Sequence, residues 1–425
     1  SLAFAWVDDL ILVGEDTDEV LEKLAKGFKI KDLGIAQHVL GMKITYQPDG
    51  SIFLGQEHYV KSLLEEYGME DCKETGTPMQ SNIKLKKASE EESAEFKKKG
   101  LDYRSAIGSL NYLSQCTRPD ITYTVGKLSQ FLEDPGEEHW TAFKRVLRYL
   151  RGTKSNGLLY KEQEIKSEVI GYVDSSWCED EESCSTSGYA FLVAGGLISW
   201  RSKKLGGVSV SSAEAEYRAY LSASQEALWV RKLTYEICQK VDEQTLIRTE
   251  NQSAIRMSKN LVYHSRSKHS MAHYDFVKDL VKNREIKLEY IPTDEMIADI
   301  FTKALDREKH LRFSSMMKVI PLEVIVPRER GSVDEIAQAN LCLFSSAPSQ
   351  DVTWSSSQEL SNVTAINQIA RRKKVLVPVD QIDNLARLEK EGLNNAGLEP
   401  ETEKSATGTN GYANQIVAIA GNESI

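Results

Sequence analysis

The pattern of apolar and polar positions predicts two β-hairpins near the start of the chain. Residues 4–7 and 10–13 are short, almost wholly apolar runs on either side of Asp8 and Asp9, which is typical of a buried hairpin with two carboxylates at its tip. Residues 39–44 and 51–54 flank a Gln-Pro-Asp-Gly turn and predict a second hairpin. Between the hairpins, acidic residues followed by lysines indicate a helix whose charges suit its dipole.

The middle of the chain has the spacing of packed helices. Residues 103–115, 121–132 and 138–151 are apolar enough for three helices, and a Thr-Arg-Pro-Asp sequence separates the first two. The third predicted helix has an apolar face made of Trp140, Phe143, Leu147 and Leu150, and a basic face made of Lys144, Arg145, Arg148 and Arg151. Before these helices, residues 84–99 form a charge run with few apolar residues, which predicts a linker or a solvated helix.

Residues 166–306 predict a single α/β domain. The expected order of elements is three strands, a helix, a strand, two helices, a strand and a helix. Residues 189–193 and 197–200 flank two glycines and give a strong hairpin signal. Residues 213–237 predict a long central helix.

Composition indicates a folded, soluble protein of more than one domain. The chain has 425 residues, of which 41% are hydrophobic and 27% charged. Its net charge of -10 argues against non-specific coating of nucleic acid, although an acidic tail after about residue 315 supplies much of that charge. Six cysteines without a CxxC pair favour a reduced compartment. No apolar run reaches the roughly 18 residues of a membrane span, so no membrane partner is expected.

Four carboxylates lie where predicted strands end or helices begin. Asp174 ends one strand, and Glu250 follows another. Glu216 lies near the N-terminus of the long helix, and Asp299 lies early in the last predicted helix. Each one alone has an ordinary structural explanation, because the chain has 63 acidic residues. Four carboxylates at the mouth of one mixed sheet are what two divalent cations about 4 Å apart require for phosphodiester hydrolysis.

The segments around these carboxylates form an ordered set of motifs. They are GYVDSSW, VSVSSAEAEYRA, ENQSAI, the HSRSKH segment and EYIPTDEMIADIFTKAL, and they resemble the RNase H domain of copia-type retrotransposon Pol polyproteins. Upstream, AWVDDLILVG resembles the YVDD hairpin of the reverse transcriptase, and YRSAIGSLNYLSQCTRPDITY through HWTAFKRVLRYLRGT resembles the connection that follows it. The resemblance covers about residues 1–315 in unbroken order.

The resemblance implies a fold, a reaction and a set of site residues. It implies a ribonuclease H-like fold that cleaves the RNA strand of RNA–DNA hybrids with two magnesium ions, or manganese in their place. The metal ligands would be Asp174, Glu216, Glu250 and Asp299. Asp8 and Asp9 match the paired aspartates of the polymerase palm, and Gly41 matches the region that touches the primer. Other Pol or Gag products are further partners in the family, which works in the cytoplasm or nucleus and in virus-like particles.

Two departures from the family pattern change what is expected of this chain. Fingers and most of the palm lie upstream of YVDD in the family, so we expect no polymerisation by this chain alone. Glu250 replaces the aspartate of the family's Asp-Asn-Gln pattern, and a carboxylate displaced by about 1 Å can cost about a hundredfold in rate. A degenerate or host-adopted hybrid-binding protein without catalysis, and a pseudogene product without function, are therefore alternatives.

Basic side chains outside the carboxylate set predict nucleic-acid contacts. Lys144, Arg148 and Arg151 lie at i, i+4 and i+7, which suits phosphate contacts along a duplex; the alternative is a solvated helix face. His269 predicts a phosphate contact or a proton shuttle. A zinc site at His264, His269 and His273 is the weaker alternative, because no nearby cysteine completes it.

The expected fold class is α/β (α+β overall), in five consecutive segments. We expect a truncated reverse-transcriptase palm end and thumb at residues 1–83, a charged linker at 84–104, connection helices at 105–165, a ribonuclease H-like mixed sheet with helices at 166–306, and a mostly disordered tail at 307–425.

Overall fold

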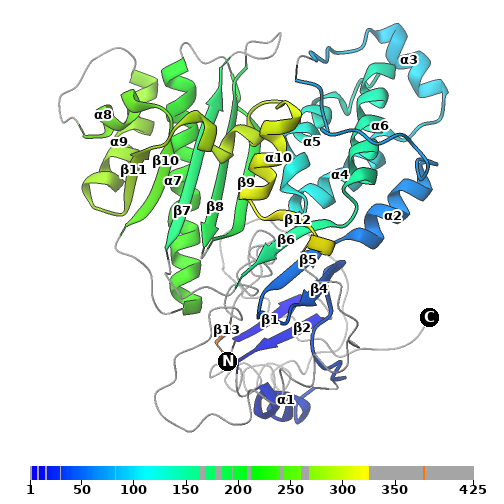
Figure 1. Cartoon of the computed structure of the whole chain (residues 1–425). Coiled ribbons are helices and arrows are strands. Elements are labelled where there is room, and N and C mark those ends of the chain that lie inside the picture. The colour runs from blue at the N-terminus through cyan, green and yellow to red at the C-terminus, as the bar shows by residue number, and fades with distance from the viewer. Residues whose placement is uncertain are drawn as a thin grey trace, which may run out of the picture. The chain divides into compact units, whose positions relative to one another are not determined.

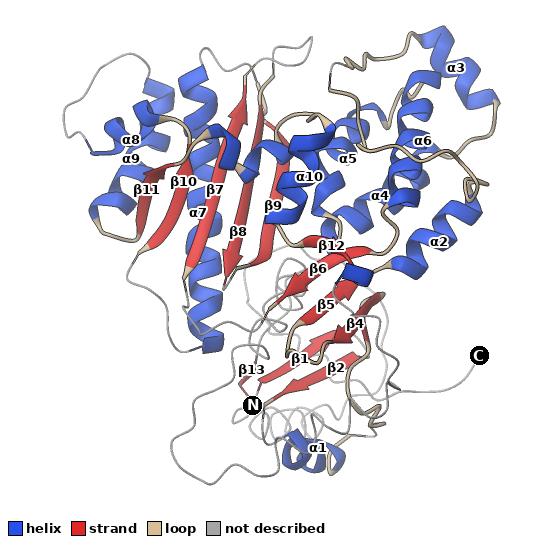
Figure 2. Ribbon diagram, in the orientation of Figure 1, coloured by secondary structure: helices blue, strands red, loops and turns tan. Residues whose placement is uncertain are grey.

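The computed structural model separates the chain into two compact units (Figures 1 and 2). It describes residues 2–6, 9–14, 17–28, 30–81, 83–161, 168–177, 184–193, 195–207, 212–238, 244–259, 268–324 and 377–378. One unit comprises residues 1–36 with 365–425, and the other comprises residues 37–364.

The first unit contains the predicted N-terminal hairpin. Strands β1 (Leu2–Trp6) and β2 (Asp9–Val13) pair antiparallel, with Trp6 opposite Asp9, so the hairpin is confirmed. Strand β13 (Val377–Pro378) pairs with the outer side of β1. Helix α1 (Thr17–Ala25) buries Val20 and Leu24. Asp8 lies outside the described residues, and Asp9 begins β2.

The second unit begins with an antiparallel sheet of strands that are far apart in sequence. Its order is β12-β6-β5-β4-β3. The strands are β3 (His38–Val39), β4 (Met42–Tyr46), β5 (Ile52–Gly55), β6 (Asn156–Tyr160) and β12 (Val319–Pro321). β4 and β5 form the predicted second hairpin, with Tyr46 opposite Ile52.

A tight turn between β3 and β4 requires glycine. Leu40 and Gly41 have φ angles of 48° and 71°, in the left-handed region that glycine adopts most readily. The Tyr112 hydroxyl donates a hydrogen bond of 2.5 Å to the Leu40 carbonyl. A Cβ atom on Gly41 would overlap that hydroxyl. The position matched to the primer-touching region is thus held by a side chain from the helices that follow.

Helices α2 and α4–α6 enclose one aromatic and aliphatic core. They are α2 (Glu57–Glu66), α4 (Tyr103–Cys116), α5 (Thr122–Leu128) and α6 (Glu137–Gly152), with short 3-10 turns η1 (Pro119–Ile121) and η2 (Ser129–Phe131) before and after α5. All three helices predicted from spacing are confirmed. The apolar face of α6 is buried in this core, as expected from its i, i+3, i+4 spacing.

The charge run at residues 84–99 takes more part in the core than its composition predicts. Residues Glu90–Lys98 form helix α3, which begins with a reciprocal capping box between Ser89 and Glu92. Phe96 is 2% exposed and lies edge-on to Tyr103, with ring centroids 6.4 Å apart. One aromatic side chain therefore anchors a helix most of whose other residues are charged, and the mean composition of the segment does not reveal this anchor.

A mixed five-stranded sheet forms the largest part of the second unit. Its order is β11-β10-β7-β8-β9, with β7–β9 antiparallel and β10 and β11 parallel to β7. The strands are β7 (Val169–Ser176), β8 (Thr186–Val193), β9 (Gly196–Lys204), β10 (Thr245–Thr249) and β11 (Ile286–Tyr290). This is the strand order of a ribonuclease H-like sheet, so the expected fold class is confirmed.

Helices flank this sheet in the predicted sequence order. Helix α7 (Ser212–Cys238) packs on β7 and β8 and against α9 (Lys268–Lys282), while α8 (Gln252–Lys259) and α9 contact β11 (Figure 1). No helix among the described residues is both long and apolar enough to cross a lipid bilayer.

Two features of the structure bear on the predicted end of the mixed-sheet domain, whose boundary at residue 306 stays a prediction. Asp299 lies in a 3-10 helix, η4 (Ile297–Phe301), preceded by η3 (Thr293–Glu295), and not in an α-helix. The chain then continues through α10 (Arg307–Met316) to β12 and η5 (Leu322–Val324) without a break at residue 306. The rest of the expected tail, apart from β13, lies outside the described residues.

Two hydrogen bonds join the mixed sheet to the elements that precede it. The Trp200 indole N–H donates to the Ser114 carbonyl at 2.8 Å, which links β9 to α4. The Tyr160 hydroxyl donates to the Leu197 carbonyl at 2.8 Å, which links β6 to β9. Both tyrosine and tryptophan are buried, so each polar atom has the partner that burial demands.

Candidate active site

The strand register places two of the predicted carboxylates at one edge of the mixed sheet. Tyr172 of β7 pairs with Arg248 of β10 in the parallel ladder. Asp174 lies two residues further along β7, and Glu250 directly follows the last residue of β10, so both lie toward the carboxyl ends of these neighbouring strands. Glu216 comes from α7, which packs on β7.

A glycine lets the fourth carboxylate approach. Gly188 of β8 lies opposite Asp174. A Cβ atom on Gly188 would lie 2.6 Å from the Phe301 Cβ and 3.1 Å from the Ala298 carbonyl oxygen, both in η4. Because no side chain stands there, η4 packs directly on β8 and carries Asp299 toward Asp174.

Asp174 and Asp299 are buried among cationic and hydroxyl partners. Asp174 is 2% exposed and accepts a hydrogen bond of 2.5 Å from the Thr302 hydroxyl. Asp299 is fully buried and forms ion pairs through both oxygens, with Lys303 Nζ at 2.8 Å from Oδ1 and Lys309 Nζ at 2.7 Å from Oδ2. Lys303 Nζ is also 3.9 Å from Asp174 Oδ2. The two carboxylates therefore share one ammonium group.

Burial and mutual repulsion favour protons on two of the carboxylates. Burial raises the pKa of Asp174 to about 7, with Asp299 and Glu250 adding to the rise and Lys303 and Thr302 opposing it. Burial, together with Asp174 and Glu250, raises the pKa of Glu216 to about 8. The four carboxylates thus act on one another electrostatically, as members of one site do.

The donor set has the chemistry of a divalent-cation site. It consists of carboxylate oxygens, which are the ligands that magnesium prefers. One of them, Glu250 Oε2, is buried without a hydrogen-bond partner, an arrangement that a bound cation would resolve. Among the described residues, no three His, Cys, Asp or Glu side chains converge closely enough to form a ready-made metal site. The residues fit the metal in kind, while Lys303 lies where two of them meet.

The predicted nucleic-acid contacts have a different environment. Arg148 Nε donates to the Lys73 carbonyl at 2.6 Å, and Arg151 Nη1 donates to the Cys72 carbonyl. These arginines thus hold the loop after α2 against α6, a role that neither the phosphate-contact nor the solvated-face interpretation included. Their nucleic-acid contacts, with those of Lys144, stay a prediction. His269 lies in α9, and its side chain is outside the described part of the chain, as is His264.

Four residues of the site were not identified from sequence. They are Gly188, Thr302, Lys303 and Lys309. Lys303 lies four residues after Asp299 in the DIFTKAL segment, so a helical spacing of opposite charges was present in the sequence. Gly188 gave no such signal, because only the packing of η4 on β8 makes its missing side chain necessary.

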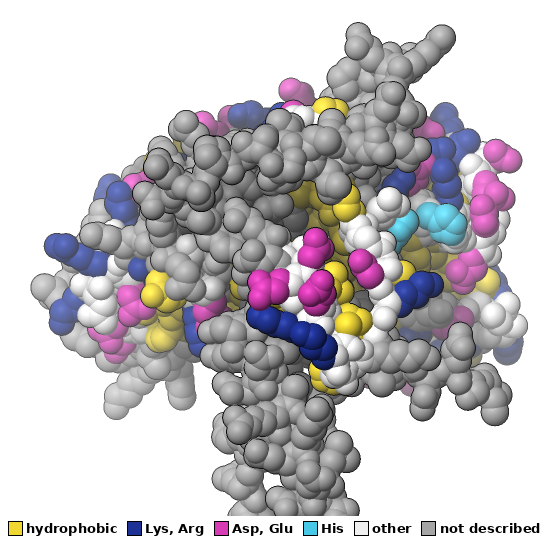
Figure 3. Space-filling view, turned by 90° about the horizontal axis from the view of Figure 1, so that it is seen from below, with side chains coloured by type: hydrophobic (Ala, Val, Ile, Leu, Met, Phe, Trp, Pro, Cys, Tyr) yellow, Lys and Arg dark blue, Asp and Glu magenta, His cyan; other side chains and the backbone are white. Residues whose placement is uncertain are grey.

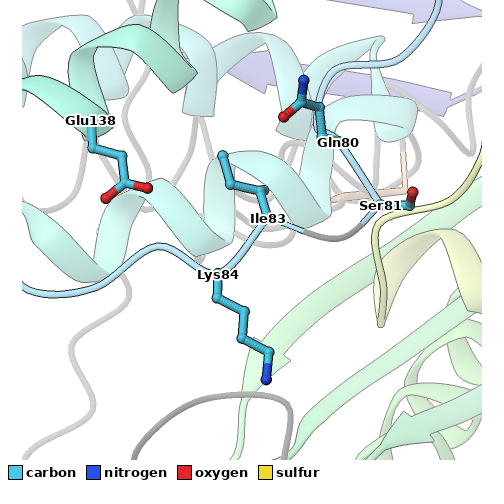
Figure 4. Close-up of a pocket in the computed structure, with 5 residues that line it drawn as sticks. All are labelled: Gln80, Ser81, Ile83, Lys84 and Glu138. Carbon is cyan, nitrogen blue, oxygen red and sulfur yellow. The ribbon is translucent and has the colours of Figure 1, made fainter.

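One hollow in the described surface is lined by none of the four carboxylates. Its volume is about 490 Å³, and Figure 4 shows the side chains that line it: Gln80, Ser81, Ile83, Lys84 and Glu138. One carboxylate and one ammonium do not make a catalytic set. The face seen in Figure 3 carries acidic and basic side chains intermixed, so charge alone marks no nucleic-acid track among its described residues.

Comparison with known proteins agrees with the motifs. Residues 2–81 match the sequence profile of the reverse transcriptase (RNA-dependent DNA polymerase) family. The chain is 38% identical over 313 residues to the retrovirus-related Pol polyprotein from transposon TNT 1-94 of Nicotiana tabacum, a match that covers 72% of this chain and 23% of that polyprotein. It is 35% identical over 217 residues to a transposon Ty5-1 protein of Saccharomyces cerevisiae, covering 50% of this chain and 69% of the relative.

Among solved structures, the chain is similar to RNase H1 from Halobacterium salinarum. The TM-score is 0.25 at 14% identity, with 32% of this chain and 94% of that chain covered.

The chain spans about a quarter or less of the Pol polyproteins that it matches over most of its own length. A reverse-transcriptase profile at its start, continuous similarity to transposon polyproteins and two-thirds coverage of a yeast transposon protein make this chain a member of the copia-type retrotransposon Pol family.

Proposed function

We propose that residues of the mixed sheet hydrolyse the RNA strand of RNA–DNA hybrids with two magnesium ions, which manganese can replace. The observation that supports the proposal is electrostatic: Asp174 acts on Glu216, and Glu250 and Asp299 act on Asp174, although these residues come from different parts of a ribonuclease H-like domain. A bound cation would offset the electrostatic repulsion between these neighbouring carboxylates.

All four carboxylates would serve as metal ligands in the proposed site. Asp174 and Glu250, at adjacent strand ends, and Glu216 and Asp299, from α7 and η4, would hold the metal ions. The ions would polarise the phosphodiester and stabilise the attacking and leaving oxygens. The Thr302 hydroxyl orients Asp174 through its hydrogen bond. Glu216 and Asp174 must lose their protons before they bind metal, so their raised pKa values make metal binding weaker at low pH.

The test is cleavage of an RNA–DNA hybrid labelled on the RNA strand, with magnesium and then with chelator. We expect the wild-type chain to cut only with magnesium, and Asp174→Asn to abolish cutting while leaving hybrid binding within about threefold. The isosteric asparagine keeps a hydrogen-bond acceptor for Thr302, so a folded variant is expected. Cutting by Asp174→Asn at the wild-type rate would contradict the proposal.

A second candidate function is hybrid binding without cleavage. It is favoured by Glu250, which replaces the aspartate of the family pattern, and whose buried oxygen has no hydrogen-bond partner. Glu250→Asp separates the two functions, because the shorter side chain restores the family's carboxylate position. If the wild-type chain binds hybrid without cutting it and Glu250→Asp cuts, the present chain is a binding protein. A gain of about a hundredfold is the expected size of that effect.

The hairpin of β1 and β2 contributes a second, separate proposal. We infer that Asp8 and Asp9 correspond to the paired aspartates of a polymerase palm, on the match of AWVDDLILVG to the reverse-transcriptase family. Their substitution by asparagine is expected to leave hybrid cleavage by the mixed-sheet site unchanged. Loss of cleavage in that variant would indicate a shared site.

A further inference from the structure

Two lysines occupy the charged end of the candidate site. Lys303 and Lys309 contact opposite oxygens of Asp299, at 2.8 Å and 2.7 Å, and Lys303 extends to within 3.9 Å of Asp174. Lys303 follows η4, and Lys309 lies in the first turn of α10. The segment that follows η4 and the first turn of α10 thus each supply one ammonium group to Asp299.

These contacts meet the same electrostatic need that a metal would meet. Asp174 is 2% exposed and Asp299 is 0% exposed, so two adjacent carboxylates have little water to stabilise their charges. A nearby cation offsets both the desolvation and the mutual repulsion.

The lysines, unlike the carboxylates, can leave. Their side chains are 33% and 24% exposed, whereas those of Asp174 and Asp299 are almost wholly buried. A lysine head group on a flexible stem moves to water with little change in the backbone. Asp299 is held in place by η4, which packs on Gly188.

We propose that Lys303 and Lys309 are the internal counter-ions of Asp174 and Asp299 in the metal-free protein, and that divalent metal must displace Lys303 to bind. The inference rests on the proposed function, because the lysine ammonium would compete with the metal ion of the proposed site for the same carboxylate oxygens. An ammonium and a divalent cation cannot both lie between the same oxygens, so the free energy of the lysine contacts is subtracted from that of metal binding. The lysines therefore set the metal concentration at which the site fills.

The test is the affinity of the full-length chain for magnesium, and for manganese by electron paramagnetic resonance, without substrate. Lys303→Met is expected to tighten binding about tenfold. Lys309→Met, which loses a contact with Asp299 alone, is expected to tighten it about threefold. Lys303→Arg keeps the charge and is expected to stay within about twofold of wild type.

A matched control removes the general effect of one positive charge. Lys287 pairs with the exposed Glu289 on β11, at 2.5 Å, outside the carboxylate set. Lys287→Met is expected to change metal affinity less than about twofold.

A second measurement follows the displacement of Lys303 directly. Labelling of Lys303 by an amine-reactive probe is expected to rise when metal saturates the wild-type chain.

The outcomes separate this inference from the proposed function. Equal metal affinity in Lys303→Met, Lys309→Met and Lys287→Met, in a wild-type chain that binds magnesium and cuts hybrid, would overturn the inference alone. Unchanged labelling of Lys303 on metal saturation would do the same. Absence of metal binding in the wild type and in all the variants would overturn both proposals. If Lys303→Met does not fold, Lys309→Met and the labelling experiment still decide.

Discussion

Arg118 and Asp120 form a fully buried ion pair next to the helical core. Arg118 is 1% exposed, and its Nη2 lies 2.7 Å from Asp120 Oδ2. The Tyr149 hydroxyl donates to the same carboxylate at 2.6 Å, and Arg118 donates to the Thr153 carbonyl at 2.9 Å. Buried charges persist only when their hydrogen-bonding groups are satisfied in this way.

Removal of one partner is expected to destabilise the protein strongly. Asp120→Ala leaves the Arg118 guanidinium buried without its counter-ion, and we expect a loss of about 3 to 5 kcal/mol in the free energy of unfolding. Chemical denaturation measures it. The control is Asp134→Ala, whose pair with Lys97 is exposed at 3.4 Å and is expected to cost less than about 1 kcal/mol. Equal losses in both variants would contradict the importance of burial.

The raised pKa values of Asp174 and Glu216 predict how the stability of the metal-free protein depends on pH. Their ordinary values are 3.8 and 4.5, and burial raises them to about 7 and about 8 in the folded chain. Between these limits the folded state binds more protons than the unfolded state, so stability falls as pH rises across that window. At a pH below the ordinary pKa values of the two carboxyl groups, the stabilisation of the folded state that their raised pKa values provide is fully present.

Thermal unfolding across this pH range, with chelator present, checks the prediction. Asp174→Asn is expected to flatten the decline, because asparagine does not titrate. Asp134→Asn, at an exposed position, is expected to leave the slope as in wild type. A metal-free protein that becomes more stable as pH rises through this window would show that the carboxylates are not buried together.

At the level of elements, the packing of η4 on β8 determines whether Asp299 reaches Asp174. Gly188→Ala is expected to push η4 outward, because the new Cβ would lie 2.6 Å from the Phe301 Cβ. We expect a loss of about 1 to 3 kcal/mol in stability and of at least about tenfold in hybrid cleavage. Gly206→Ala is the matched control, since nothing lies within 4 Å of its added Cβ. Similar behaviour of both variants would argue against close packing as the cause.

The sequence predicted the hairpin of the mixed sheet from local signals. Residues 189–193 and 197–200 are apolar runs that flank two glycines, and β8 and β9 form there as expected. The helix at Glu90–Lys98 was harder to predict, because Phe96 is a single apolar anchor in a charged segment. The ion pair between Lys309 and Asp299 depends on the path of the chain between η4 and α10, which no local pattern encodes.

The motifs pointed to Asp174, Glu216, Glu250 and Asp299 as site residues, and their role as metal ligands stays a prediction. Asp174 and Glu250 were chosen from their places at strand ends, and Glu216 and Asp299 from their places early in predicted helices. A helix around Asp299 was predicted, but not its 3-10 type, since five residues are too few for periodicity to distinguish a 3-10 helix from an α-helix. The carbonyl partners of Arg148 and Arg151 lie more than 70 positions away along the chain, so no spacing rule could find them.

For the whole molecule, we propose that residues 37–324 fold without the rest of the chain. The described elements of the second unit, from β3 to η5, pair and pack with one another. A fragment of residues 37–324 is expected to unfold within about 2 to 4 °C of the full-length chain, a shift that corresponds to about 1 kcal/mol for a domain of more than about 150 residues. Differential scanning calorimetry measures this.

A second fragment tests the expected boundary at residue 306. Ending the chain there removes α10 and β12, and with them the Lys309 partner of Asp299 and the strand that pairs with β6. We expect this fragment to be markedly less stable than residues 37–324. Equal stability of the two would show that the ribonuclease H-like part ends at residue 306, as its motifs suggest.

The position of β12 has a consequence for how the chain is made on the ribosome. β6 pairs with β5 on one side and with β12 on the other, but β12 is synthesised only after the entire mixed sheet. Until Val319–Pro321 emerges, one side of β6 presents unpaired backbone N–H and C=O groups, as an edge strand does. The nascent chain therefore passes through a long interval in which β6 can pair with another chain, and chaperones that cover exposed strands would act at that stage.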